Sequence, residues 1–292
     1  MRVLDRHTLD RHMRRKLTNA LFVALTTAAT GIAIIALLLI LYSLVVNGFG
    51  GLNWHVFTMD QPPPEMPGGL RNAILGSLEL CSIAMALALV IGILAGTWLA
   101  EYGDGQGLGG KRLAGVVRFL NDVLLSAPSI LIGLFVYELL VRPFQGFSAA
   151  AGAVALAFLA TPVVTRTTED ILRLQSNQLR EAGMALGAGK GLVIRAIIWR
   201  ASKSGLMTGA LLGFARISGE TAPLLFTALG NPNLSFKLTE PIGSLPGAIF
   251  QFALSAYDDW QSLAWVGALL IAATVLTANI IGRALARGSA PK

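Results

Sequence analysis

Charged residues and cysteines are scarce in this sequence. Of its 292 residues only 13% are charged, whereas 54% are hydrophobic and the mean hydropathy is +0.65. A soluble domain could not bury that much apolar surface, so the composition excludes a soluble globular protein and indicates an integral membrane protein. The one cysteine, Cys81, excludes an intrachain disulfide. The three histidines lie in no grouping typical of metal ligands, and we expect no metal site.

Motifs for covalent chemistry are also lacking. The segment GQGLGGKR, residues 105–112, comes near to the spacing of a P-loop, but Arg112 stands where a Ser or Thr would hold magnesium. No strand is predicted before this segment, and the sequence carries no protease, triad or haem motif. We therefore expect a chain that is not an enzyme and has no cofactor of its own.

Long apolar stretches are abundant. A bilayer core needs about 20 apolar residues per helix, and six stretches meet or approach that length: 20–46, 73–100, 123–141, 147–165, 205–229 and 262–282. Their uniform apolarity, without a period of two, predicts helices rather than a β-barrel. Pro128 is expected to kink the third of them. The sequence thus predicts an all-α integral membrane fold with six transmembrane helices.

Basic residues are concentrated on one side of these spans. Most Lys and Arg residues lie in the two tails and in the second and fourth loops, whereas the opposite side has only Arg71, Arg142 and Lys237. By the positive-inside rule both termini are cytoplasmic, and the net charge of +7 reflects topology and anionic lipid rather than nucleic acid. The predicted parts are a cytoplasmic tail (1–19), a transmembrane domain (20–284) with a cytoplasmic loop (166–204), and a second cytoplasmic tail (285–292).

The fourth loop carries the most specific pattern. From Asn177 to Leu186 apolar and polar residues are spaced as in a surface helix, which Gly187 and Gly189 are expected to end. Glu181-Ala182-Gly183 followed by Gly187 resembles the EAA loop of ABC importer permeases, whose pattern is E-A-A, three residues, G, nine residues and I-x-L-P. Ile197 falls at the expected place, whereas Gly183 replaces the second Ala and Trp199-Arg200 replaces Leu-Pro.

The resemblance implies that this loop is a coupling helix seated on a cytoplasmic ATPase. The residues that it implicates are Arg180, Glu181, Ala182, Gly183 and Gly187. A helix of small residues can approach a partner closely, and Arg180 and Glu181 can pair across the contact. The alternative is an ordinary amphipathic helix at the lipid boundary.

Three longer stretches make the resemblance more specific. RFLNDVLLSAPSILIGLFVYELLV, TRTTEDILRL and ARISGETAPLLFTAL resemble PstA-type permeases of bacterial phosphate ABC importers, and the similarity runs from about residue 20 to 285. The resemblance implies a type I ABC importer permease fold and phosphate uptake across the bacterial inner membrane. The partners that it implies are a second permease (PstC type), two ATPase subunits (PstB type) and a periplasmic phosphate-binding protein (PstS type).

Two charges, Arg216 and Glu220, lie within the fifth apolar stretch, where a charge costs roughly 2.5–3.5 kcal/mol on insertion scales. The guanidinium fork of Arg216 suits phosphate, and Glu220, one turn further, can hold it between transport events. Thr221 adds a hydroxyl group. The family pattern also points to Arg166, at the cytoplasmic end of the fourth span. We predict that these four residues contribute to substrate translocation.

Other interpretations remain open from the sequence. Arg216 and Glu220 can form a structural ion pair with each other, with Glu79 or Glu138, or with the partner subunit, and Arg166 can be a positive-inside anchor. The substrate can be another oxyanion, such as sulfate or molybdate. A secondary transporter driven by an ion gradient is a third class, but such a carrier has no ATPase for the EAA-like loop to contact.

Overall fold

The computed structural model describes residues 4–103 and 108–287. Within these ranges every regular element is a helix, which confirms the all-α prediction. Residues 105–107 of the P-loop-like segment and 288–292 of the C-terminal tail lie outside the described residues. The helices follow in the order α1 (Leu4–Gly50), α2 (His55–Thr58), α3 (Arg71–Glu101), α4 (Leu108–Ser126), α5 (Ser129–Val136), η1 (Tyr137–Val141), α6 (Arg142–Phe144), α7 (Ala149–Arg173), α8 (Asn177–Ala185), α9 (Lys190–Val193), η2 (Ile194–Ile198), α10 (Trp199–Ala201), α11 (Lys203–Ser218), α12 (Ala222–Thr227), α13 (Leu245–Ala253) and α14 (Asp258–Arg287).

Four of the described helices are long and apolar enough to cross a membrane, and they lie within α1, α3, α7 and α14. A fifth span is present if α4 and α5 are counted together, although they meet at an angle of 108°. Pro128 lies at this break, as expected from a residue that cannot donate a backbone hydrogen bond. The six-span count therefore remains a prediction, compatible with the fold.

The predicted span over 205–229 is divided in the structure. Helix α11 ends at Ser218, and the short α12 begins only at Ala222. Gly219 destabilises helix, and Pro223 at the start of α12 supplies no backbone N–H group to continue the hydrogen-bond ladder. The break therefore follows from the sequence, and it places Glu220 between two helices.

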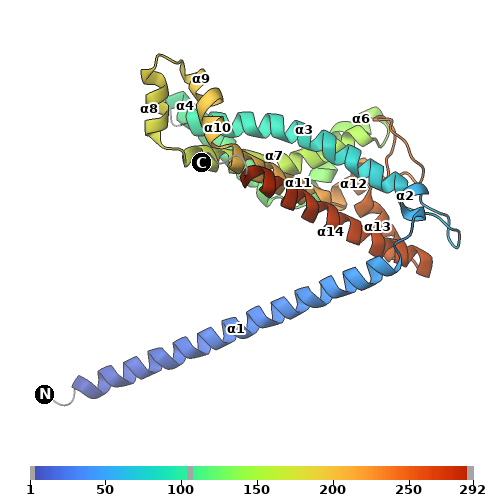
Figure 1. The fold of residues 1–292 in the computed structure, drawn as a ribbon, viewed down its shortest axis with the longest axis horizontal. Coiled ribbons are helices and arrows are strands. Elements are labelled where there is room, and N and C mark those ends of the chain that lie inside the picture. Colours follow the sequence, from blue (N-terminus) through green and yellow to red (C-terminus); the bar gives the residue numbers. More distant parts are fainter. Residues whose placement is uncertain (1–3, 104–107, 288–292) are drawn as a thin grey trace.

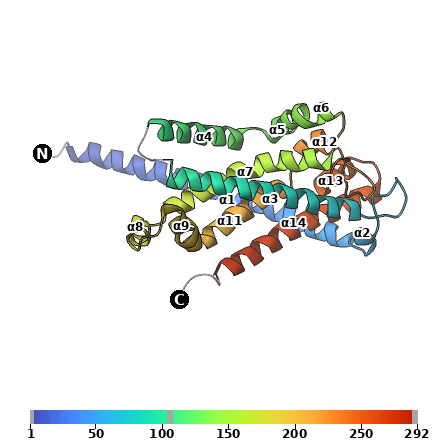
Figure 2. The same cartoon turned by 90° about the horizontal axis from the view of Figure 1, so that it is seen from above.

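The helices form an elongated bundle with different structures at its two ends. Figure 1 shows α8 and α9 at one end and α2 and α13 at the other, with α3, α7, α11 and α14 between them. The long α1 meets α14 near the α2 end and diverges from the bundle. Figure 2 shows α4 and α5 along one edge of the bundle and α14 towards the opposite edge.

The central contact of the bundle is the packing of α3 on α7. A Cβ atom on Gly96 would lie 2.5 Å from the backbone oxygen of Thr165, and one on Gly92 would lie 2.8 Å from the Val164 side chain. Only glycine lets the two backbones approach so closely, as is common between helices in membranes. The two helices are therefore in direct steric contact along the C-terminal half of α3.

At the end of the bundle that carries α2 and α13, Asp60 joins two loops. Its carboxylate accepts hydrogen bonds from Nε of Arg71 (2.9 Å) and from the backbone N–H of Leu234 (3.0 Å). Burial disfavours ionisation of Asp60, but the hydrogen bonds and charge of its donors outweigh that effect, so the pKa of this carboxyl lies below its ordinary value. Asp60 thus holds the loop before α3 against the loop after α12.

We expect Asp60→Asn to lower the thermal stability of the purified chain at neutral pH, because the charge that pairs with Arg71 is lost. A lowered pKa contributes stability above the ordinary pKa of an aspartate, and this contribution is lost as the pH falls through the lowered value. The parent and the variant should therefore converge in acid. Thermal denaturation in detergent across this pH range measures the effect, with Glu65→Gln, an exposed carboxyl on the same loop, as the control. A pH-independent difference would contradict the assignment.

Candidate translocation and coupling sites

Helix α8 confirms the surface helix predicted in the fourth loop. The Ser176 side chain caps its first turn by accepting a hydrogen bond from the backbone N–H of Leu179 (3.4 Å). Gly187 follows the helix with φ of +79°, in the left-handed region that favours glycine. The helix therefore begins and ends within a residue of the positions that the sequence predicts.

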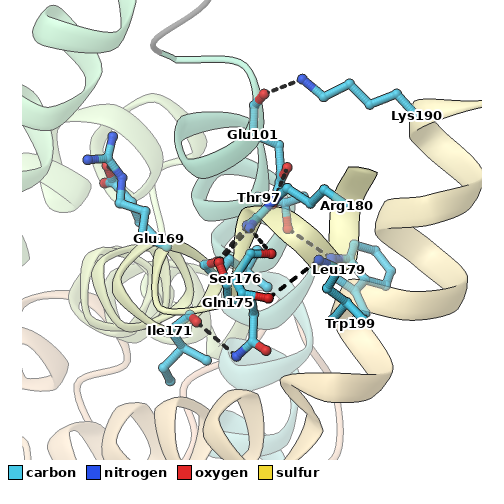
Figure 3. Close-up of polar contacts among 12 residues, drawn as sticks. Thr97, Glu101, Glu169, Ile171, Gln175, Ser176, Leu179, Arg180, Lys190 and Trp199 are labelled. Atoms are coloured by element: carbon cyan, nitrogen blue, oxygen red, sulfur yellow. Dashed lines mark hydrogen bonds and ion pairs between the residues drawn. The ribbon is translucent and has the colours of Figure 1, made fainter. Parts of the chain in front are cut away.

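Arg180 points inward, from α8 towards the ends of α3 and α7 (Figure 3). Its Nη2 lies 2.6 Å from Oε1 of Glu101, and its Nε lies 3.0 Å from Oε2 of the same carboxylate. The guanidinium also donates to the backbone oxygens of Leu172 (2.7 Å) and Gln175 (2.6 Å). Arg180 is thus engaged by groups of its own chain, and its predicted pairing across a contact with an ATPase remains a prediction.

The other residues predicted to contact an ATPase divide into an exposed and a buried set. Glu181 and Ala182 are exposed, and so is Gly187, whereas Gly183 is buried against the turn that follows α9. Two large apolar side chains beside them are exposed as well, Met184 at 46% and Leu186 at 88%. An exposed charge next to exposed apolar side chains on an anchored helix is a surface suited to a protein partner.

Gly183 is the position where α8 meets the chain behind it. A Cβ atom there would lie 2.9 Å from Cδ1 of Ile197 and 2.9 Å from Cγ2 of Val193. We expect Gly183→Leu to separate α8 from these residues and to make the loop more sensitive to limited proteolysis. Gly191→Leu is the matched control, because a Cβ atom on Gly191 meets nothing within 4 Å. Equal sensitivity of the two variants would show that α8 does not depend on this contact.

Sequence reasoning missed the residues that hold this loop in place. Lys190 donates to the backbone oxygen of Glu101 and lies 4.1 Å from the ring centre of Tyr102. Nε1 of Trp199 donates to Oγ1 of Thr97 (3.1 Å). The available signal was the carboxylate of Glu101 at the end of an apolar span, facing a loop rich in basic residues, but one sequence does not reveal which basic residue pairs with it.

The structure brings Arg216 and Glu220 together as an ion pair at the break between α11 and α12. The Glu220 side chain is only 10% exposed, whereas that of Arg216 is 44% exposed. Thr221 directly precedes α12 and is half-buried. The carboxylate therefore fixes one part of the guanidinium, and the rest of Arg216 is accessible from outside this chain.

Arg166 lies in a separate cluster of charged residues towards the C-terminal end of α7. Its Nε is 3.2 Å from Oδ2 of Asp170, and its Nη1 is 3.7 Å from Oδ1 of Asp122 on α4. These ion pairs are about half exposed, so they contribute little to stability. The structure does not join Arg166 to Arg216 or Glu220, and its predicted role in translocation remains a prediction.

The alternative partners of Arg216 within this chain are occupied elsewhere or stand apart. Glu138 pairs with Arg142 at 2.6 Å, and Oε2 of Glu79 is buried without a hydrogen-bond partner among the described residues. Among the carboxylates of this chain that the sequence offers as partners of Arg216, the one that pairs with it in the described structure is Glu220.

Comparison with known proteins agrees with this architecture. A solved structure of the MetNI methionine ABC transporter in an inward-facing conformation matches the chain with a TM-score of 0.63, at 20% identity, over 75% of this chain and 97% of that one. At this identity the likeness shows the fold alone, which is the permease fold of a type I ABC importer. In sequence, residues 88–291 match the family described as the binding-protein-dependent transport system inner membrane component.

The curated relatives are more specific. The phosphate transport system permease protein PstA of Haemophilus influenzae is 49% identical over 269 residues, which cover 92% of this chain and 94% of that protein. PstA of Xylella fastidiosa is 46% identical over 281 residues, covering 95% and 96%. The chain therefore belongs to the PstA family of phosphate transport system permease proteins, within the broader family of binding-protein-dependent inner membrane components.

Proposed function

We propose that this chain is the permease subunit through which an ATP-driven importer takes up inorganic phosphate. The observation that carries the proposal is the identity of 46–49% to PstA proteins over almost the whole chain. Two features of the structure support it: a surface helix anchored at one end of the bundle, and an arginine paired with a buried carboxylate at the break between α11 and α12.

The arginine is suited to an anion that must pass without being trapped. The planar guanidinium of Arg216 can donate two hydrogen bonds to phosphate, and its exposed part faces away from this chain. Glu220 keeps the charge paired when no anion is present and weakens binding by repulsion. We assign Arg216 to transient contact with phosphate, Glu220 to its counter-charge, and Thr221 to an additional hydroxyl contact.

The surface helix α8 is suited to contact a separate protein that supplies the energy for transport. Helix α8 presents Glu181, Ala182 and the apolar side chains of Met184 and Leu186. We propose that this surface seats on an ATPase of the PstB type, which hydrolyses the ATP, so the chain itself needs no cofactor. The remaining partners are a second permease of the PstC type, which completes the pathway, and a periplasmic phosphate-binding protein of the PstS type.

The orientation follows from the positions of charge and of the coupling helix. The chain is an inner membrane component that crosses the membrane several times. The start of α1 and the end of α14 both point towards the end of the bundle that carries α8 (Figure 1). Because α8 must meet a cytoplasmic ATPase, we propose that both termini are cytoplasmic.

Transport in membrane vesicles that contain the chain with its partner subunits tests the proposal. We expect phosphate accumulation to require ATP and the binding protein. ATP-dependent uptake of sulfate or molybdate in preference to phosphate would contradict the assigned substrate. Phosphate uptake driven by an ion gradient without ATP would contradict the assigned mechanism.

A further inference from the structure

The C-terminal end of α3 contacts the segment between α7 and α11, residues 174–202, here called the coupling loop, at several positions. Glu101 binds Arg180 on α8 and, through its backbone oxygen, Lys190 at the start of α9. One turn earlier, Thr97 accepts the hydrogen bond from Trp199 of α10. Figure 3 shows the side chains of Arg180, Lys190 and Trp199 directed towards Glu101 and Thr97 of α3. Residues far apart along the loop are therefore fixed to a single short segment of another helix.

The contact between Glu101 and Arg180 is the strongest of them. The side chains are 3% and 16% exposed, and two nitrogens of the guanidinium face the two carboxylate oxygens. Such bidentate, charge-assisted bonds are geometrically specific. Separating a buried pair leaves an unpaired buried charge, which is strongly unfavourable. The loop is thus held in one position relative to α3.

A small apolar core supports the same contact. Leu172 of α7, Val193 of α9 and Ile198 of η2 are buried together, and Ala100 of α3 packs against them. The ends of α3 and α7 and the middle of the coupling loop therefore share one packed cluster. A close-packed cluster transmits the displacement of one member to the others.

The covalent connection from the loop to α11 is less regular. It passes through η2, a π-helical turn, and then through Ser202, where α10 ends and α11 begins. π-Helical turns inside helices are frequent at functional sites. The Ser202 hydroxyl is buried without a hydrogen-bond partner among the described residues. The peptide chain thus reaches α11 through an irregular segment, whereas the contacts with α3 are direct side-chain contacts.

We propose that Glu101 is a positioning residue that fastens the coupling loop to α3, so that a displacement of α8 is delivered to α3 before it reaches α11. Helix α7 shares the displacement, because Leu172 lies in the same cluster and α3 touches α7 closely at Gly92 and Gly96. It passes to α11 at Gly213, where a Cβ atom would lie 3.1 Å from Val164 of α7 and 3.6 Å from Met85 of α3. The inference rests on the proposed function, because it assumes that an ATPase moves α8.

The experiment measures phosphate uptake and ATP hydrolysis in the same proteoliposomes, with the complete complex and the binding protein. We expect Glu101→Gln to assemble and hydrolyse ATP but to lower the phosphate transported per ATP roughly tenfold, because a charge-assisted clamp is replaced by a weaker neutral contact. Thr97→Val, which removes the acceptor of the Trp199 hydrogen bond and keeps the shape, should lower the ratio less. Ser202→Gly, which loosens the covalent path, should leave the ratio close to that of the parent.

The ratio separates transmission from simple loss of structure, because a misassembled complex loses hydrolysis and uptake together. If Glu101→Gln fails to assemble, Thr97→Val against Ser202→Gly makes the same comparison. An unchanged ratio in the α3 variants, or an equal or larger loss in Ser202→Gly, would overturn the inference. Failure of the parent complex to accumulate phosphate with ATP would instead contradict the proposed function, so the two failures are distinguishable.

Discussion

Arg216→Gln should abolish phosphate uptake while the protein still inserts and co-purifies with its partners. The substitution removes the charge that we propose compensates the anion inside the membrane, where a charge is costly to leave uncompensated. Arg216→Lys should reduce uptake less severely, because the charge remains but the two-pronged hydrogen bonding of the guanidinium is lost. Uptake of labelled phosphate, normalised to the amount of assembled complex, measures both effects.

The variants of Glu220 distinguish transport from packing. Its side chain is 10% exposed and pairs with Arg216, so Glu220→Gln should alter uptake without preventing assembly. In the double variant Arg216→Gln, Glu220→Gln neither charge is left unpaired, which makes replacement of a purely structural pair close to neutral. We expect the double variant to assemble and to remain inactive. Near-normal uptake would leave the pair a structural role only.

Gly187→Asp should uncouple ATP hydrolysis from transport. Gly187 has φ of +79° and is exposed at the end of α8, beside the surface proposed to contact the ATPase. The variant adds a negative charge at the end of a helix, where the helix dipole is also negative, and at a surface that a partner must approach. Uptake should fall several-fold, and ATP hydrolysis should become less dependent on the binding protein.

Gly187→Asn is the matched control for this prediction. Asparagine has nearly the same shape as aspartate and tolerates the left-handed conformation, so it retains the turn without the charge. Its uptake should lie between those of the parent and of Gly187→Asp. Full, coupled uptake by Gly187→Asp would show that α8 does not make the proposed contact.

The sequence predicted the helical class and most of the long helices because these depend on local composition. A run of about 20 apolar residues has few alternatives to a helix in a membrane. The surface helix α8 was predicted nearly to the residue, because Gly187 ends it by its own backbone preference. The break after Ser218 also has a local cause, because Gly219 and Pro223 both disfavour a continuous helix.

Several contacts could not be predicted, because they depend on residues far apart in the chain. Arg180 was expected to face a partner, yet it pairs with Glu101, 79 residues earlier. Arg166 lies between two aspartates, one of them on α4. Long side chains can reach many partners, and only the packing of the helices decides which carboxylate is within reach.

By itself, the sequence determined that this protein is helical, that it belongs in a membrane, and that Arg216 and Glu220 lie one turn apart within it. Each of these properties follows from composition or from the short-range geometry of a helix. Only the tertiary structure decided that Arg180 pairs with Glu101 and that α3 therefore carries the coupling loop. Those features arise where α3, α7 and α8 meet, because a buried carboxylate is stable only beside the donors that the fold brings to it.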